Sequence, residues 1–238
     1  MRRVMRQSWR DLLFLHWSVP PEVIQNLLPK GLTVDTFDGS AFVGLVPFHM
    51  RGVRPLWSPS VPGLSAFHEV NVRTYVHHAG RNPGVWFFSL DANNLVAVTI
   101  ARLAFHLPYY NAAIHFRERP QGISYDVQRR RGWGGRPDAR SRIEFEPLLP
   151  CPAEPGTLEH FLVERYLLYA ADRTGLLVGQ VHHAPYPLQT ARVDRLEDTL
   201  VTAVGFPPTL FTPSPIAHFA RGVDVDIYPL RRVSPGSG

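Results

Sequence analysis

The fold of this chain is decided by residues Phe67–Ala112, which read FHEVNVRTYVHHAGRNPGVWFFSLDANNLVAVTIARLAFHLPYYNA. Two runs of strand-forming residues, Glu69–His77 and Val85–Leu90, flank a turn over Gly80–Gly84 that is rich in glycine, asparagine and proline. A helical pattern over Asn94–Phe105 follows and ends before a proline. We therefore predict two strands and a helix at the centre of the fold.

Polar residues recur on these otherwise apolar elements. In a strand, alternate side chains point to the same side, and one face of the first strand carries four polar residues: Glu69, Asn71, Arg73 and Tyr75. Arg102 lies in the helical pattern that follows. Buried charges are costly unless they are paired or bound to a ligand. The stretch therefore predicts a pocket lined by charged groups.

The rest of the chain predicts a mainly β (α+β) fold. The 23 prolines and 18 glycines divide it into nine to twelve strands, including a hairpin of Leu32–Phe37 and Ala41–Met50 around Asp38-Gly39. We expect a β-barrel, or two sheets wrapped into one body, with three or four short outer helices. A single domain over residues 1–238 is expected, with a loop-rich crossing segment near 147–156.

The expected helices follow local signals. A short helix begins at Pro21, a second covers Asn94–Phe105, a third covers Leu158–Ala170, and a capping box at Asp194 predicts a fourth that runs to Val204. The apolar stripe of the second helix would be formed by three residues: Val96, Ile100 and Leu103.

Composition narrows the classes of function. Hydrophobic residues are 45% and charged residues 19%, so a sizeable core can form. The single cysteine, Cys151, excludes an internal disulfide and a multi-cysteine zinc site. There is no stretch of about 18 apolar residues and no signal-peptide cleavage site. We expect a cytoplasmic protein with no membrane partner, and a homo-oligomer is left open.

Several segments of the chain resemble a known family. They read DLLFLHWSVPPE, LLPKGLTVDTFDGSAFVGLVPF, FHEVNVRTYV, GVWFFSLDA, ARLAFHLPYYNA, FLVERYLLYA and HHAPYPL. They resemble the bacterial YqjF-like domain-of-unknown-function family, which belongs to the acetoacetate decarboxylase-like superfamily. The resemblance implies a barrel-like double sheet with an internal pocket. It also implies that Glu69 matches a pocket glutamate and that Arg102 matches the arginine of a pocket helix.

One departure from the superfamily bears on the chemistry. The resemblance implies a lysine pair after the pocket helix, where one lysine forms an imine with a β-keto acid. In this chain those two positions are Tyr109 and Tyr110. Lys30 is the only lysine, and it lies between Pro29 and Gly31 in a predicted turn. Imine formation needs an activated primary amine, so we do not expect acetoacetate decarboxylase activity.

The candidate residues have two interpretations each. Glu69 could be a general acid or base whose pKa is raised by burial, or a partner in a buried salt bridge with Arg73 or Arg102. Arg102 could clamp a substrate carboxylate, or it could keep Glu69 ionised. Tyr109 and Tyr110 could donate hydrogen bonds to a carbonyl oxygen, or could pack in the core.

Further ligand contacts are expected from Arg73, His106, His183 and Tyr186. Tyr186 is the tyrosine of a rigid Pro-Tyr-Pro corner, and His183 precedes that corner. A structural role is the alternative for His183. The histidines show no metal-ligand spacing, and no nucleotide-binding glycine pattern occurs. We therefore expect no metal and no cofactor.

Three hypotheses for function remain. The first is a lyase or isomerase that acts on a small carbonyl or carboxylate compound, with Glu69 as acid/base, Arg102 as anion clamp and Tyr109 orienting the carbonyl. The second is a non-catalytic protein that binds a small, apolar or anionic molecule. The third and weakest is nucleic-acid binding through the arginine-rich stretch Arg129–Arg136, for which a solvated loop is the competing interpretation.

Overall fold

The structure is a computed structural model that describes residues 2–55, 65–120, 122–130 and 138–233. It confirms a mainly β fold. The described residues form a sheet of 13 strands, more than predicted, partly because two of them are only two residues long. The strands are β1 (Met5–Val19), β2 (Thr33–Val34), β3 (Ala41–Pro55), β4 (Phe67–His78), β5 (Arg81–Ala92), β6 (Tyr109–Arg119), β7 (Gly122–Arg129), β8 (Arg140–Pro150), β9 (Leu167–Asp172), β10 (Gly175–His183), β11 (Leu188–Asp198), β12 (Ile216–Ile227) and β13 (Arg231–Arg232).

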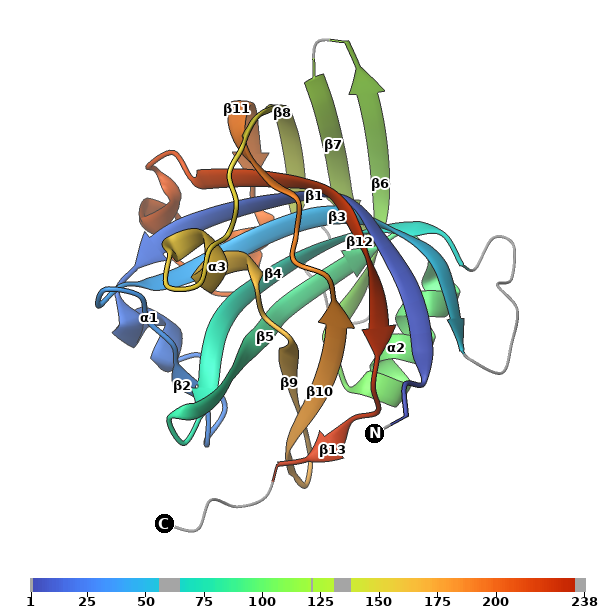
Figure 1. Ribbon diagram of the computed structural model, residues 1–238, viewed down its shortest axis with the longest axis vertical. Helices are drawn as coiled ribbons and strands as arrows, with labels where there is room; N and C mark the ends of the chain where they lie inside the picture. Colours follow the sequence, from blue (N-terminus) through green and yellow to red (C-terminus); the bar gives the residue numbers. More distant parts are fainter. Residues whose placement is uncertain (1, 56–64, 121, 131–137, 234–238) are drawn as a thin grey trace.

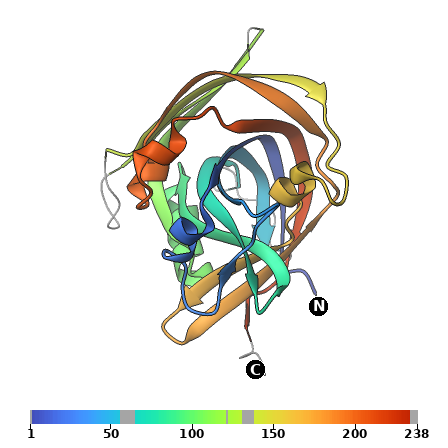
Figure 2. The same cartoon turned by 90° about the vertical axis from the view of Figure 1, so that its left-hand side faces the viewer.

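The strand pairings close two rings that share a wall. The shared wall is formed by β12, β1, β3, β4 and β5 (Figure 1). Strands β9 and β10 join its two edges to make a lower ring. Strands β6, β7, β8 and β11 join the same edges to make an upper ring. Figure 2 shows the strands curving around the body of the molecule.

Two hydrophobic cores follow from the alternation of side chains on the shared wall. On β1, Leu13 and Leu15 pack with the core that contains Tyr125 of the upper ring. The residues between them, Leu12 and Phe14, pack with the core that lies inside the lower ring. Because successive strand side chains point to opposite faces, the same wall serves both cores.

The helices are short and lie beside the strands. They are α1 (Pro21–Gln25), α2 (Leu95–Phe105), α3 (Leu158–Val163), α4 (Leu200–Ala203) and the 3-10 helix η1 (Pro208–Phe211). In Figure 1, α3 lies on the left and α2 on the lower right of the sheet. No helix among the described residues is long and apolar enough to cross a membrane.

Two predictions of helices were wrong in their extent. The helix that begins at Leu158 ends at Val163, because the following residues pair as β9 with β5 and β10. Asp194 lies in β11, and the carboxylate that accepts a hydrogen bond at the start of α4 is that of Asp198, from the backbone N–H of Val201. Pairing with neighbouring strands overrides a helix propensity that is only a weak local preference.

Two further predictions need correction. The residues before Asp38 do not form a long hairpin with β3, because Thr33 and Val34 pair with β4 instead and only Phe37 bridges to Ser40. In α2, Val96 is 47% exposed and does not form part of an apolar stripe. The side chains of Ile100 and Leu103 lie outside the described residues.

Candidate functional site

The candidate site is built on the lower-ring face of β4. The strand pairs with β3 without interruption from Phe67 to Thr74, so alternate residues keep pointing into the lower ring. Four polar side chains follow one another on this face and all are buried: Glu69, Asn71, Arg73 and Tyr75. The sequence pattern predicted this shared face. Four residues of strand separate the Cα atoms of Glu69 and Arg73 by about 13 Å.

Glu69 lies at the α2 end of this face. It is 2% exposed, and the Tyr109 hydroxyl donates a hydrogen bond of 2.7 Å to its Oε2. Burial raises the pKa of Glu69 to about 8, against the lowering effect of hydrogen bonds from Tyr109 and Asn71. Close to neutral pH the carboxyl can therefore both give and accept a proton, as a general acid or base must.

Among the described residues, no ion pair joins Arg102 to Glu69, and Arg102 contacts Tyr109, the hydrogen-bond partner of Glu69. Its guanidinium donates a hydrogen bond to the backbone carbonyl of Tyr109 and lies 5.9 Å from the centre of the Tyr110 ring. The guanidinium carbon of Arg129 also lies over the Tyr110 ring, 4.1 Å from its centre. Arg102 and Tyr110 thus flank Tyr109 from the side of α2 and the upper ring.

Arg73 lies at the α3 end of the face. Its Nη2 donates hydrogen bonds to the carbonyl oxygen of Leu162, at 3.1 Å, and to the Tyr75 hydroxyl, at 3.3 Å. Its guanidinium also lies 5.4 Å from the centre of the Phe14 ring. Among the described residues, no carboxylate forms an ion pair with it, and its buried Nε has no hydrogen-bond partner. A buried guanidinium without a countercharge is the kind of group that binds an anion.

His16 and Tyr75 complete the surroundings of Arg73. The Tyr75 hydroxyl donates its one proton to the Leu162 carbonyl, so His16 Nε2, 2.6 Å from that hydroxyl, carries the proton of their bond. Burial and the nearby Arg73 lower the pKa of His16. The close packing depends on Gly44, where a Cβ would lie 3.1 Å from the His16 ring and 3.3 Å from Arg73.

The corner after β10 closes the other side. The rings of His183 and Tyr186 lie 4.6 Å apart, and the Tyr186 ring contacts Phe14 at 5.2 Å. The Glu164 carboxylate accepts hydrogen bonds from the Tyr186 backbone and the Tyr166 hydroxyl, at 2.9 and 2.6 Å. Burial lowers the pKa of His183 and raises the pKa of Tyr186, so both are neutral near pH 7.

Several buried polar atoms around this face have no hydrogen-bond partner among the described residues. They are His16 Nδ1, Asn71 Oδ1, Arg73 Nε and His183 Nε2. Buried polar groups are normally satisfied, and each unmet bond costs roughly 1–3 kcal/mol. These four atoms come from β1, β4 and β10, and a polar molecule bound between these strands would satisfy them.

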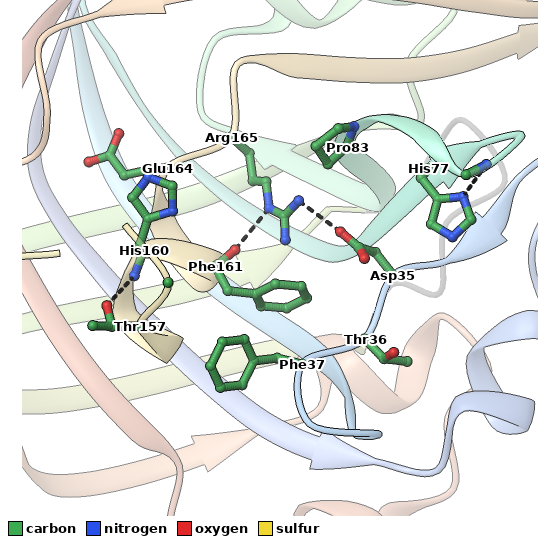
Figure 3. Close-up of a pocket in the computed structure, with 12 residues that line it drawn as sticks. Asp35, Thr36, Phe37, His77, Pro83, Thr157, His160, Phe161, Glu164 and Arg165 are labelled. Carbon is green, nitrogen blue, oxygen red and sulfur yellow. Dashed lines mark hydrogen bonds and ion pairs between the residues drawn. The ribbon is translucent and has the colours of Figure 1, made fainter. Parts of the chain in front are cut away.

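A surface cavity of about 420 Å³ lies beside this end of the face. Figure 3 shows Arg165 in its wall, where the guanidinium forms an ion pair of 2.8 Å with Asp35 and a hydrogen bond to the backbone carbonyl of Phe161. The ring of Phe161 and the guanidinium of Arg165 also contact the Tyr75 ring, at 5.2 and 5.3 Å. These two side chains therefore separate the cavity from Tyr75 and Arg73.

The structure thus divides the predicted residues into two groups. Glu69, Tyr109 and, behind them, Arg102 and Tyr110 lie near α2. Arg73, His183 and Tyr186 lie near α3, together with Tyr75. The sequence predicted Tyr75 on the polar face of the strand, whereas His16, which also lies here, was not selected from the sequence. The signal for His16 was its position two residues after Phe14 in a buried strand, where a polar residue is unexpected.

Other sequence predictions fall outside these groups. His106 is exposed just after α2, with a backbone φ of 52°, so it does not join the buried residues. Lys30 is exposed in a turn, as the sequence predicted. Arg129 is not part of an exposed basic loop, because it is buried in β7 and forms a salt bridge with Asp91. The next residue of that stretch, Arg130, is exposed, and residues 131–136 lie outside the described residues.

Solved structures with the same fold include enzymes. An acetoacetate decarboxylase-like enzyme from Sphingomonas wittichii RW1 matches with a TM-score of 0.66 and 13% identity, over 98% of this chain and 94% of the other. The acetoacetate decarboxylase of Legionella pneumophila matches with a TM-score of 0.65 and 13% identity, over 96% and 87% of the two chains. The enduracididine biosynthesis enzyme MppR, in complex with pyruvate, matches with a TM-score of 0.61 and 13% identity, over 97% and 91%.

Sequence comparison gives a more direct relationship. The uncharacterized protein YqjF of Bacillus subtilis (strain 168) is 38% identical over 232 residues, which cover 97% of this chain and 93% of that protein. The pattern of the DUF2071 family, described as an uncharacterized conserved protein, matches residues 6–224. This chain therefore belongs to the DUF2071 family.

Proposed function

We propose that this protein is an enzyme that moves a proton on a small carbonyl compound bearing a carboxylate, without a Schiff-base lysine. Glu69 is the proton carrier, Tyr109 positions its carboxyl group, and Arg73 binds the substrate carboxylate. The observation that carries the proposal is that two buried ionisable groups on one face of β4 have no countercharge among the described residues.

The chemistry follows from the state of Glu69. With a pKa of about 8, part of the population is a carboxylate that can take the proton from the carbon next to a carbonyl group. The C–H bond breaks, the proton passes to Glu69, and the electron pair moves to the carbonyl oxygen to give an enol or enolate. Return of the proton to another atom is an isomerisation, and loss of a neighbouring group is a lyase reaction.

The spacing of the two groups suggests the shape of the substrate. The Arg73 guanidinium leans toward Tyr75 and Leu162, away from Glu69, and the two Cα atoms are about 13 Å apart. A compound whose carbonyl is separated from its carboxylate by several bonds fits this distance better than a very short oxo acid. MppR, which shares the fold, binds pyruvate, and this supports oxo acids as the chemical class.

Exchange of hydrogen for deuterium next to the carbonyl group tests the proposal. Pyruvate and longer oxo acids of increasing chain length are incubated with the protein in deuterated water, and loss of the proton signal is followed by NMR. We expect exchange to be fastest with a longer acid and to be lost in Glu69→Gln. The exposed Glu154 provides the control variant Glu154→Gln, which should exchange normally.

The same assay separates the role of Arg73. Arg73→Met should raise KM for the carboxylate compounds and leave kcat nearly unchanged, because Arg73 binds the substrate equally in the ground and transition states. Binding without exchange would overturn catalysis and leave a non-catalytic ligand-binding protein. Exchange that is unchanged in Glu69→Gln would overturn the role of Glu69, and the absence of any binding would overturn the whole proposal.

A further inference from the structure

A further group of side chains converges around the start of α3, next to the α3 end of the candidate site. Cys151 follows β8, Glu159 lies in the first turn of α3, and His218 lies on β12. The sulfur, carboxylate and imidazole atoms that could bind a metal all lie within 4.8 Å of one another. No local pattern in the sequence indicates this group, because folding brings β12 and α3 together around Cys151.

His218 gives an independent indication that something binds here. It is 3% exposed, its Nδ1 has no hydrogen-bond partner, and its Nε2 is 4.0 Å from Glu159 Oε1, too far for a hydrogen bond. Among the described residues, no hydrogen bond to its ring is found. A buried imidazole without a hydrogen-bond partner is costly, and Nε2, the nitrogen on the side of Glu159, is the atom that a ligand here would engage.

We propose that Cys151, Glu159 and His218 bind a divalent transition-metal ion, of which Zn²⁺ fits best. A thiolate, a carboxylate and a neutral imidazole are typical zinc ligands. The thiolate and the carboxylate together balance the charge of the ion, so the occupied site is neutral in its partly buried setting. Tetrahedral zinc with bonds of about 2.0–2.3 Å needs ligand atoms about 3.3–3.8 Å apart, which small side-chain rotations from the present arrangement achieve.

A cysteine nucleophile with a histidine base is the competing interpretation. In such a triad the thiol and the carboxylate bind opposite nitrogens of the imidazole, and so they lie on its two sides. Here the sulfur and the carboxylate lie close to each other as well as to the imidazole.

The position of the site gives the ion a further effect. Its ligands come from the segment after β8, from α3 and from β12, so an ion would tie α3 to the shared wall. The same helix carries Leu162, whose carbonyl oxygen accepts the hydrogen bonds of Arg73 and Tyr75. Glu159 and Cys151 are partly exposed, which leaves room for water as the fourth ligand.

Cobalt(II) binding to the full chain tests this proposal, and it does not depend on any catalytic activity. Cobalt bound to a thiolate gives a charge-transfer absorption band, and Cys151 is the only cysteine in the chain. We expect one equivalent of cobalt to give this band and the visible spectrum of a tetrahedral site, and Zn²⁺ to displace it. Zinc affinity is then measured by competition with a chromophoric chelator.

The variants decide between a built site and adventitious binding to surface histidines. Cys151→Ser should abolish the band, and Cys151→Ser and Glu159→Gln should each weaken zinc binding at least tenfold. The exposed His182 provides the control His182→Gln, which should bind like the parent protein. Circular dichroism of each variant shows that it is folded. Absence of the band in the parent protein, or zinc affinity that is unchanged in Cys151→Ser, would overturn the proposal.

Discussion

Two buried arginines on opposite sides of the shared wall differ in how their charge is met. Arg129, on the side of the upper ring, is 2% exposed and forms two hydrogen bonds of 2.7 Å with Asp91, from Nε and Nη2. Arg73, in the lower ring, is 9% exposed and contacts only the neutral oxygens of Leu162 and Tyr75 through its hydrogen bonds.

This difference indicates that the charge of Arg129 stabilises the fold, whereas the charge of Arg73 is available to bind a ligand. The two carboxylate oxygens of Asp91 match the fork of the Arg129 guanidinium, so this pair has no need of a ligand. The buried Nε of Arg73 has no hydrogen-bond partner among the described residues. Glu69, whose Cα lies about 13 Å away on the same face, is protonated below a pKa of about 8 and is not the countercharge of Arg73. Arg129 therefore has its charge balanced within the protein, whereas Arg73 leaves its charge available to a ligand.

The largest expected effect on the free energy of unfolding comes from breaking the salt bridge between Arg129 and Asp91. Arg129→Met leaves the Asp91 carboxylate buried without its partner, and this should lower the free energy of unfolding by about 3–5 kcal/mol. Urea denaturation at neutral pH measures the loss. The double variant Asp91→Leu/Arg129→Met should regain most of it, because no buried charge remains. A loss below about 1 kcal/mol in the single variant would contradict a structural role for the pair.

The next effect concerns Glu69 and depends on pH. Its pKa is about 8 in the folded chain and 4.5 ordinarily, so between these values the folded chain holds a proton that the unfolded chain has released. The stability that Glu69 contributes is complete below pH 4.5 and is lost as the pH rises toward 8, by ~1.4 kcal/mol per pH unit.

Glu69→Gln keeps the side-chain shape and removes this titration. Relative to the parent protein, the variant should therefore gain stability steadily across that window, with little change in the difference on either side of it. Urea denaturation over a series of pH values measures the difference. A difference that does not vary with pH would show that Glu69 is not buried as a protonated acid.

Replacement of Arg73 should change the stability of the protein much less than replacement of Arg129. Arg73→Met removes a buried charge that has no countercharge to leave behind, and the variant loses two hydrogen bonds to neutral oxygens. We expect the free energy of unfolding to change by no more than about 1 kcal/mol in either direction. Exposed Arg81 supplies the control Arg81→Met. If Arg73→Met destabilised the protein as much as Arg129→Met, the distinction between the two rings would fail.

The smallest expected effect comes from the partner of Glu69. Tyr109→Phe keeps the ring and removes a hydrogen bond that lowers the pKa of Glu69. The pKa of Glu69 should therefore rise, and the stability that Glu69 contributes should persist to higher pH than in the parent protein. The same pH series detects the shift. A fall in the pKa of Glu69 would mean that Tyr109 does not donate to the ionised form.

Part of the site was predictable from local sequence. The alternation of β4 placed Glu69, Asn71, Arg73 and Tyr75 on one face, and folding kept that face intact because β4 pairs regularly with β3. Tyr109 and Tyr110, next to each other at the start of β6, point to different sides of the sheet, so one serves Glu69 and the other packs against Arg129.

Other parts were not predictable from local sequence. The helix expected through Ala170 ended at Val163, because the contacts of β9 with two other strands outweigh helix propensity. Arg129 was expected in a solvated loop, because no local pattern indicates that it forms a salt bridge with Asp91, 38 residues away. Cys151, Glu159 and His218 come from three separate elements, and their convergence has no local signature.

The sequence alone therefore determined the mainly β class, the absence of a usable lysine and the polar face of β4, since strand propensity and side-chain alternation act over neighbouring residues. Only the tertiary structure decided which buried charged side chains form salt bridges and which have no charged partner among the described residues. The closing of each ring brings together residues that are far apart in the chain, and the partner of each charge depends on strand order and register, which no local pattern of residues encodes.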